Sequence, residues 1–306
     1  MSWSTLTAPS KARVLGLLLS CILVIASLGV LSVKGLNFGL DFTGGYITEI
    51  NTTSVTTITD LKAKLSSEVA SKLTITKAGE YHYVLREAPE ASKASTWQSE
   101  LNEQGVDYSV LSSSFLGSQV GDELFEQGCL ALFAALIAIM VYLAVRFEWR
   151  LAVGSVVALL HDLILVLGLF SLLGLEFNLT VLASLLAIIG YSLNDSIIVG
   201  DRVRELLRIK PDNQRINTHV VINDAIGSTL TRTLITSGTT LATIACIWLL
   251  AGAALTGFAI ALFVGIVVGT FSSICIAATL PQLLGLSSEN YTQTLDDNTK
   301  AYMDMP

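Results

Sequence analysis

Polar residues whose chemistry could move an ion stand inside otherwise apolar stretches of this sequence. His161 and Asp162 are adjacent in one stretch, Asp195 lies in a second, and Arg232 opens a third. If these stretches cross a membrane, each charged group costs ~2.5 to 3.5 kcal/mol at the bilayer centre, so each needs a partner, a water-filled cavity or a function. An acid that gains and loses a proton near an arginine is one such function.

Asp195 and Arg232 form the predicted ion pair. Their stretches run in opposite directions and join through one polar connection, so both side chains fall at similar depth. Hydroxyl groups then recur on one helical face, at Thr236, Thr239 or Thr240, and Thr243. Hydroxyls by themselves indicate contacts between helices, but an acid, an arginine and a hydroxyl row together favour an ion relay. The candidate relay residues are Asp195, Arg232, Asp162, His161, Asn194, Ser192, Thr236 and Thr240.

The composition places these residues in a polytopic helical membrane protein. Of 306 residues, 52% are hydrophobic and 14% are charged, whereas soluble domains carry roughly 25% charged residues. Six stretches have the length of about 17 to 25 residues that crosses a bilayer as a helix. They are 14–32, 128–145, 151–174, 178–200, 233–250 and 258–280. The first is too long, and lacks the cleavage site, for a removed signal peptide.

The distribution of Lys and Arg predicts the orientation of these helices, because positively charged loops resist translocation. Basic residues occur in segment 1–13, between the second and third helices, and in the loop 201–232, but are absent from 175–177 and 251–257. Both termini, including the acidic tail 286–306, are therefore predicted to be cytoplasmic. The polar segment 33–127 is predicted to lie on the other side, as a periplasmic domain.

Segment 33–127 is predicted to fold as a small α+β ferredoxin-like domain. Its alternating runs and helical runs follow the order β-α-β-β-α-β. The strands are Tyr46–Ile50, Leu73–Thr76, Tyr81–Arg86 and Asp107–Phe115, and the helices are a run capped by Thr59 and Ser92–Gln104. Gly44 and Gly45 precede them and are typical of a turn with positive φ. The domain contains no nucleophile with a base, metal-ligand spacing or phosphate-binding loop, so we expect neither an enzyme nor a cofactor.

The last predicted helix carries small residues at every fourth position, namely Ala261, Gly265, Gly269 and Ser273. Such a ridge allows close approach of another helix. The sequence does not say whether that helix belongs to the same chain.

Several motifs make the chain similar to the SecF family, the six-helix subunits of the bacterial SecD–SecF protein-export complex. They are Gly39–Gly45, Arg146–Arg150 with His161 and Asp162, Ile189–Ile197, Asp201–Glu205 and Arg232–Leu234. The resemblance implies half of an RND-type transporter in the bacterial inner membrane, with SecD supplying the other six helices. It also implies that the ion-motive force assists preproteins leaving the SecYEG channel, with YajC and YidC as further partners.

The same resemblance assigns roles to single residues. Asp195 and Arg232 would be required for ion transport. The family signature and hinge of the external domain would be Gly39, Asp41, Phe42, Gly44 and Gly45. Where the family commonly has a Gly-Pro step before the second helix, this chain has Leu116–Gly121, which predicts a softer hinge. The coupling ion stays open, since these oxygen atoms suit Na⁺ as well as H⁺.

Two other functions stay open. One is an RND-type exporter of small molecules or lipids, and the other is a passive scaffold of the translocon in which the polar residues only hold helices together. An intramembrane protease with Asp162 and Asp195 as its acid pair is disfavoured, because Arg232 would keep Asp195 ionised. The net charge of −7 argues against a nucleic-acid partner, which would require a basic face.

Overall fold

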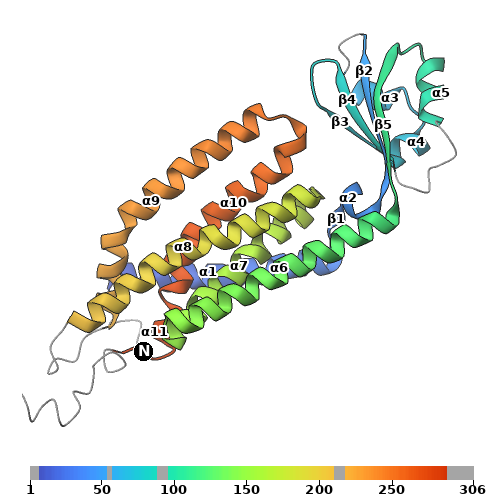
Figure 1. Cartoon of the computed structure of the whole chain (residues 1–306). Coiled ribbons are helices and arrows are strands. Elements are labelled where there is room, and N and C mark those ends of the chain that lie inside the picture. Colours follow the sequence, from blue (N-terminus) through green and yellow to red (C-terminus); the bar gives the residue numbers. More distant parts are fainter. Residues whose placement is uncertain (1–6, 54–56, 88–95, 210–217, 288–306) are drawn as a thin grey trace, which may run out of the picture.

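The computed structural model describes residues 7–53, 57–87, 96–209 and 218–287. Figure 1 shows a bundle of long helices with a smaller sheet domain attached at one end. Among the described residues, six helices are long and apolar enough to cross a membrane, as predicted. They are α1 (Ala8–Lys34), α6 (Ser118–Arg146), α7 (Trp149–Leu173), α8 (Leu179–Ile209), α9 (Thr218–Leu250) and α10 (Thr256–Ser272). The sixth span is Thr256–Leu283 as a whole, in which α10 continues through a π-helical turn, η4 (Ser273–Ala277), to α11 (Leu280–Leu283).

The predicted connection 201–232 is largely helical, which corrects the prediction. Helix α8 continues to Ile209 and α9 already begins at Thr218, while residues 210–217 lie outside the described residues. Charged residues mark the end of the apolar stretch, but the helix itself continues, because charged side chains one turn apart form ion pairs that stabilise it. Two such pairs occur here, Arg204–Asp201 at 3.3 Å and Arg202–Glu205 at 2.7 Å. The predicted tail 286–306 lies outside the described residues from 288 onward.

Three of the six helices form the inside of the bundle. In the most apolar part of α7, α8 and α10, 50%, 56% and 50% of the residues are buried, against 11% in α1, 6% in α6 and 17% in α9. Hydropathy does not separate the two groups, since α1 and α6 are the two most apolar helices. The outer helices therefore present apolar surface that suits lipid or partner helices.

The small-residue ridge of α10 lies against α7 and α8 of the same chain. A Cβ atom added at Gly265 would lie 2.4 Å from Cδ1 of Ile188 in α8, and one added at Gly269 would lie 3.3 Å from Oδ2 of Asp162 in α7. The predicted close contact is confirmed, and the structure identifies its partner helices. The absence of side chains at these positions lets polar groups of three helices meet.

The sheet domain has the predicted order of strands and helices, with the first helix divided in two. Its four strands form an antiparallel sheet in the order β3-β4-β2-β5. The elements are β2 (Gly45–Thr52), α3 (Ile58–Ala63), α4 (Ser67–Lys72), β3 (Leu73–Lys77), β4 (His82–Glu87), α5 (Thr96–Glu103) and β5 (Tyr108–Leu116). One face of the sheet buries Ile50, Tyr83 and Leu85 against Trp97 and Leu101 of α5.

The first helix of this domain begins at a different residue from the predicted one. Thr57, not Thr59, caps α3: its Oγ1 accepts from the backbone N of Asp60 at 3.1 Å, and Oδ2 of Asp60 accepts from the N of Thr57 at 3.3 Å. Only Thr57 has an acid three positions later, which is the spacing of a capping box. The hydrogen bonds from Thr57 hold the pKa of Asp60 below its ordinary value. The predicted helix 92–104 is observed from Thr96, and residues 88–95 lie outside the described residues.

Candidate functional site

Asp162 lies fully buried in the middle of α7, with three hydrogen-bonding partners. Its Oδ2 accepts from Oγ of Ser192 in α8 at 2.5 Å and from Oγ of Ser272 in α10 at 2.9 Å. Its Oδ1 lies 2.9 Å from Nδ1 of His161. The side chains of His161 and Asp162 are 4% and 0% exposed. One carboxyl group thus joins the three inner helices.

Ser272 is a site residue that sequence reasoning missed. Serines in membrane helices are common and mostly bond to their own helix, and Ser272 also donates to the carbonyl of Gly269 at 3.1 Å. The available signal was its position beside Ser273 in the small-residue ridge. A ridge that brings helices together also brings its hydroxyl groups to the acid on the facing helix.

Asp195, in α8, is buried as well but is bonded differently. It is 1% exposed, and its Oδ1 has no hydrogen-bond partner. The hydroxyl of Ser237 in α9 is the hydrogen-bonding neighbour of this carboxyl. The same hydroxyl also forms a hydrogen bond of 2.8 Å with the hydroxyl of Thr270 in α10. A buried polar atom without a partner is unfavourable by about 1 to 3 kcal/mol. This acid therefore depends on a proton, a water molecule or a further partner.

The predicted ion pair between Asp195 and Arg232 is not formed. None of the ion pairs among the described residues joins these two side chains within 4.0 Å. Arg232 is exposed, and its charge acts on the carboxyl only over a longer distance. The face of α9 near Asp195 carries Ser237, and at 3.6 residues per turn Arg232 lies about 140° away around the helix. The rotation of the helix therefore separates the two charges.

The threonine hydroxyls of α9 bond mainly to α9 itself. Thr236 and Thr240 each donate to the carbonyl one turn earlier, at 2.9 Å. Contact with α8 is made by Tyr191, whose hydroxyl donates to the Thr236 carbonyl at 2.8 Å and lies 2.5 Å from Oγ1 of Thr240. The exposed members of the predicted set are Arg232, Asn194, Thr239 and Thr243. The predicted relay residues therefore form separate clusters, with no continuous hydrogen-bonded chain among the described residues.

Gly44 and Gly45 lie where the sheet domain joins the bundle. Their φ angles are 71° and 143°, so the predicted positive φ is confirmed, and such values favour glycine. A Cβ atom at Gly44 would lie 2.8 Å from the backbone N of Ser118, and one at Gly45 would lie 2.2 Å from the carbonyl O of Glu87. Both glycines are thus required by backbone conformation and by close approach.

Asp41, whose role the sequence left open, ties this junction to the start of α8. It belongs to the short helix α2 (Leu40–Thr43). Its Oδ2 accepts from the backbone N of Leu179 at 2.9 Å, and a carboxylate is favourable at the N-terminus of a helix. The helix that Asp41 caps is the one that carries Ser192 and Asp195. The junction and the buried acids are therefore connected through a single element.

A second set of contacts reinforces the same junction. Strand β1 (Asn37–Phe38) pairs in parallel with β6 (Glu176–Phe177), and the N of Gly39 donates to the carbonyl of Phe177 at 2.9 Å. Arg86 of β4 reaches Glu176 at 3.2 Å. An aromatic cluster fills the space between α2, α6 and these strands. It consists of Phe38, Phe42, Phe125 and Phe177.

Two family models match this chain. Residues 96–287 match the model described as protein export membrane protein SecD/SecF, C-terminal, and residues 29–53 match the SecD/SecF GG motif. The first covers the five helices α6 to α10 and the acids within them. The second covers the junction with Asp41, Gly44 and Gly45.

Similar proteins agree with these matches. The chain is 40% identical over 279 residues to the protein translocase subunit SecF of Desulfurispirillum indicum. The aligned region covers 88% of this chain and 89% of that protein. It is 39% identical over 283 residues to the SecF subunit of Escherichia coli O157:H7, covering 90% and 87%.

A solved structure has the same fold. The crystal structure of SecDF, a translocon-associated membrane protein from Thermus thermophilus, superposes with a TM-score of 0.77 and 32% sequence identity. The match covers 93% of this chain but 39% of that one, so this chain spans about two fifths of the solved protein. More than half of the chain lies in the family model, and relatives about 40% identical match nearly nine tenths of it, so this multi-pass membrane protein belongs to the SecD/SecF family of protein export membrane proteins.

Proposed function

We propose that the protein works as a SecF-type translocase subunit, which uses the ion-motive force to promote the late steps of preprotein export. The observation that carries this proposal is the hydrogen bond between Asp41 and the N of Leu179. Through it, the anchor of the sheet domain caps the helix that holds Asp195. A change at the buried acid can therefore move the domain that would meet the exported chain.

The proposal places the protein in the bacterial inner membrane, with both termini in the cytoplasm. The sheet domain, in the order β3-β4-β2-β5, is then a periplasmic ferredoxin-like domain. Support comes from the opposite end of the bundle, which gathers basic residues: Arg146 pairs with Asp201 at 2.9 Å, and Arg150 with Glu148. Positively charged ends stay on the cytoplasmic side.

A SecD subunit is the proposed partner within the membrane. Asn194 of α8 and Arg232 of α9 are exposed at membrane depth, together with Thr239 and Thr243, and polar groups facing lipid are unfavourable. Helices of a second half would cover this polar face, and the solved SecDF chain is long enough to contain them, since this chain covers 39% of it. SecYEG, the emerging preprotein, and YajC and YidC are the proposed partners outside this interface.

The coupling step in this proposal is the gain and loss of a cation at Asp195. Its Oδ1 has no fixed donor, so a proton, or Na⁺ held by nearby oxygen atoms, changes its bonding with Ser237 and its attraction to Arg232. One charge that crosses the membrane yields ~2.3 kcal/mol per 100 mV, enough to shift a conformational equilibrium more than tenfold. The ion we favour is H⁺, with Na⁺ held by hydroxyl, amide and carbonyl oxygen atoms as the alternative.

Translocation of a preprotein into inverted membrane vesicles tests this function. Vesicles carrying the natural chain or Asp195→Asn, each with SecD at equal abundance, are compared with and without an ion gradient. We expect Asp195→Asn to abolish the gradient-dependent part of translocation and to leave the rest intact. Equal stimulation by the gradient in both would contradict the proposal and favour a scaffold. Replacing sodium by potassium separates Na⁺ from H⁺ coupling, since a proton user does not respond.

A further inference from the structure

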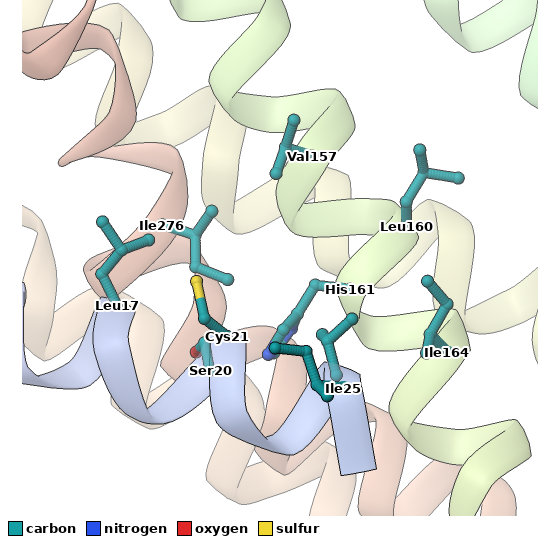
Figure 2. Close-up of a pocket in the computed structure, with 10 residues that line it drawn as sticks. Leu17, Ser20, Cys21, Ile25, Val157, Leu160, His161, Ile164 and Ile276 are labelled. Atoms are coloured by element: carbon teal, nitrogen blue, oxygen red, sulfur yellow. The ribbon is translucent and has the colours of Figure 1, made fainter. Parts of the chain in front are cut away.

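A pocket of about 360 Å³ lies between α1, α7 and η4. Figure 2 shows its walls, which are almost entirely aliphatic, including Leu17 and Ile25 of α1, Leu160 of α7 and Ile276 of η4. Only Ser20, Cys21 and His161 bring polar or sulfur atoms to it. The pocket is separate from the face of α8 and α9 at which a SecD subunit is proposed.

Two side chains of this pocket are buried and lack partners. Ser20 is 1% exposed and His161 is 4% exposed. The Oγ atom of Ser20 and the Nε2 atom of His161 have no hydrogen-bond partner among the described residues. Figure 2 shows the imidazole ring of His161 extending from α7 toward α1, the helix that carries Ser20. Buried polar atoms are almost always paired, so two unpaired atoms in one pocket indicate a ligand.

The position of the two atoms restricts the chemistry of that ligand. Ser20 is the thirteenth of the 27 residues of α1, and His161 the thirteenth of the 25 residues of α7. Both therefore lie near the middle of their membrane helices, away from the depth of the lipid headgroups. Acyl chains can fill the aliphatic part of the pocket but offer no hydrogen bond. A water molecule requires two to four polar partners, and Ser20 and His161 supply two. It would occupy only a small part of this pocket.

The hydrogen bonds of Asp162 favour one tautomer of the His161 ring. Oδ2 of Asp162 accepts from Ser192 and Ser272, and Oδ1 is left to accept from Nδ1 of His161 at 2.9 Å. With Nδ1 as the donor, Nε2 of the neutral ring is an acceptor. A water molecule donates to Nε2 and can also bond with the hydroxyl of Ser20.

We propose that the floor of this pocket is a water-binding site within the membrane, formed by Ser20 and His161. The water completes the hydrogen bonding of His161 and so fixes the ring against Asp162. The site would then position the carboxyl that joins α7, α8 and α10. It does not depend on the proposed export function, because it concerns the bonding of His161 alone.

Water-edited solid-state NMR of the whole chain in bilayers, with its SecD partner and ¹⁵N-labelled histidine, tests the proposal. The chain has three histidines, His82, His161 and His219, and the difference from His161→Gln identifies the His161 signals. We expect magnetisation to pass from water to the ring of His161, with Nε2 unprotonated. His82, which is half-buried in the sheet domain, is the internal positive control.

Serine variants identify the second partner of the water. Ser20→Ala should reduce water transfer to His161 about fivefold, the ratio that one hydrogen bond is typically worth. Ser27→Ala, on the same helix against Gly168, is the matched control and should leave the transfer unchanged. Absence of His161 from the water-edited spectrum, while His82 appears, would overturn the proposal. Transfer from lipid chains in place of water would overturn it as well, and equal transfer in Ser20→Ala and Ser27→Ala would remove Ser20 from the site.

Discussion

Two buried acids on neighbouring helices of this bundle have opposite bonding. Asp162 is 0% exposed and meets a donor from each of three side chains. Asp195 is 1% exposed and leaves Oδ1 without a partner. Burial alone therefore does not separate a structural acid from a coupling acid. The number of donors does, because a filled set of donors fixes the carboxyl in one bonded arrangement, whereas an oxygen without a donor is free to gain a proton or another partner.

The largest expected effect is on folding, at the fully bonded acid. Asp162→Ala leaves His161, Ser192 and Ser272 without their common acceptor. We expect a loss of about 3 to 5 kcal/mol in the free energy of unfolding, because each buried group left without its hydrogen-bond partner costs about 1 to 3 kcal/mol. Unfolding in mixed detergent micelles measures it. Asp195→Ala is the matched control, and a loss as large as that of Asp162→Ala would break the distinction between the two acids.

A smaller effect is expected at the junction that connects Asp195 to the sheet domain. Asp41→Ala removes the acceptor at the start of α8, and loss of such a cap costs about 1 kcal/mol. The bundle should stay folded, while the gradient-dependent part of translocation falls, because α8 no longer moves the junction. Translocation into inverted vesicles measures both parts. Asp122→Ala, an exposed residue of α6, should change neither, and an undiminished gradient response in Asp41→Ala would remove Asp41 from the coupling path.

The smallest effect is expected far from both acids, in the capping box of α3. Thr57→Ala should speed hydrogen exchange of segment 57–63 about fivefold, the usual effect of a lost cap, without changing export. The pKa of Asp60 is lowered by its bonds to Thr57, so this stabilisation is present above the unfolded-state pKa and is lost as the pH falls through the folded-state pKa. Exchange mass spectrometry of the whole chain at two pH values checks both. Acid-insensitive exchange in the natural chain would contradict this account of the cap.

The difference between the two acids was largely hidden in the sequence. The length of the apolar stretches predicted six helices, and the alternation of apolar and polar residues predicted the strands and their order along the chain, because both depend on local periodicity. Asp162 and Asp195 looked alike, since their donors come from other helices: Ser272 lies 110 residues from Asp162. The outward position of Arg232 depends on the rotation of α9, which tertiary contacts set. The bond from Leu179 to Asp41 spans 138 residues, so spacing could not reveal it.

The helix ends were missed for a related reason. Hydropathy finds the part of a helix that suits lipid, whereas α8 and α9 extend beyond it on charged residues such as Arg204. Thr59 in place of Thr57 is a local error, which the capping-box spacing to Asp60 would have corrected. Local chemistry was therefore readable from the sequence, and only the meeting of distant residues required the structure.

Infrared difference spectroscopy at two pH values tests the contrast between the acids most directly. The C=O stretch of a protonated carboxyl group is compared in the complex with the natural chain, Asp195→Asn and Asp162→Asn. We predict a pH-dependent carboxyl band that is lost in Asp195→Asn and kept in Asp162→Asn, since only Asp195 has an oxygen without a donor. A band that persists in Asp195→Asn and disappears in Asp162→Asn would contradict the account.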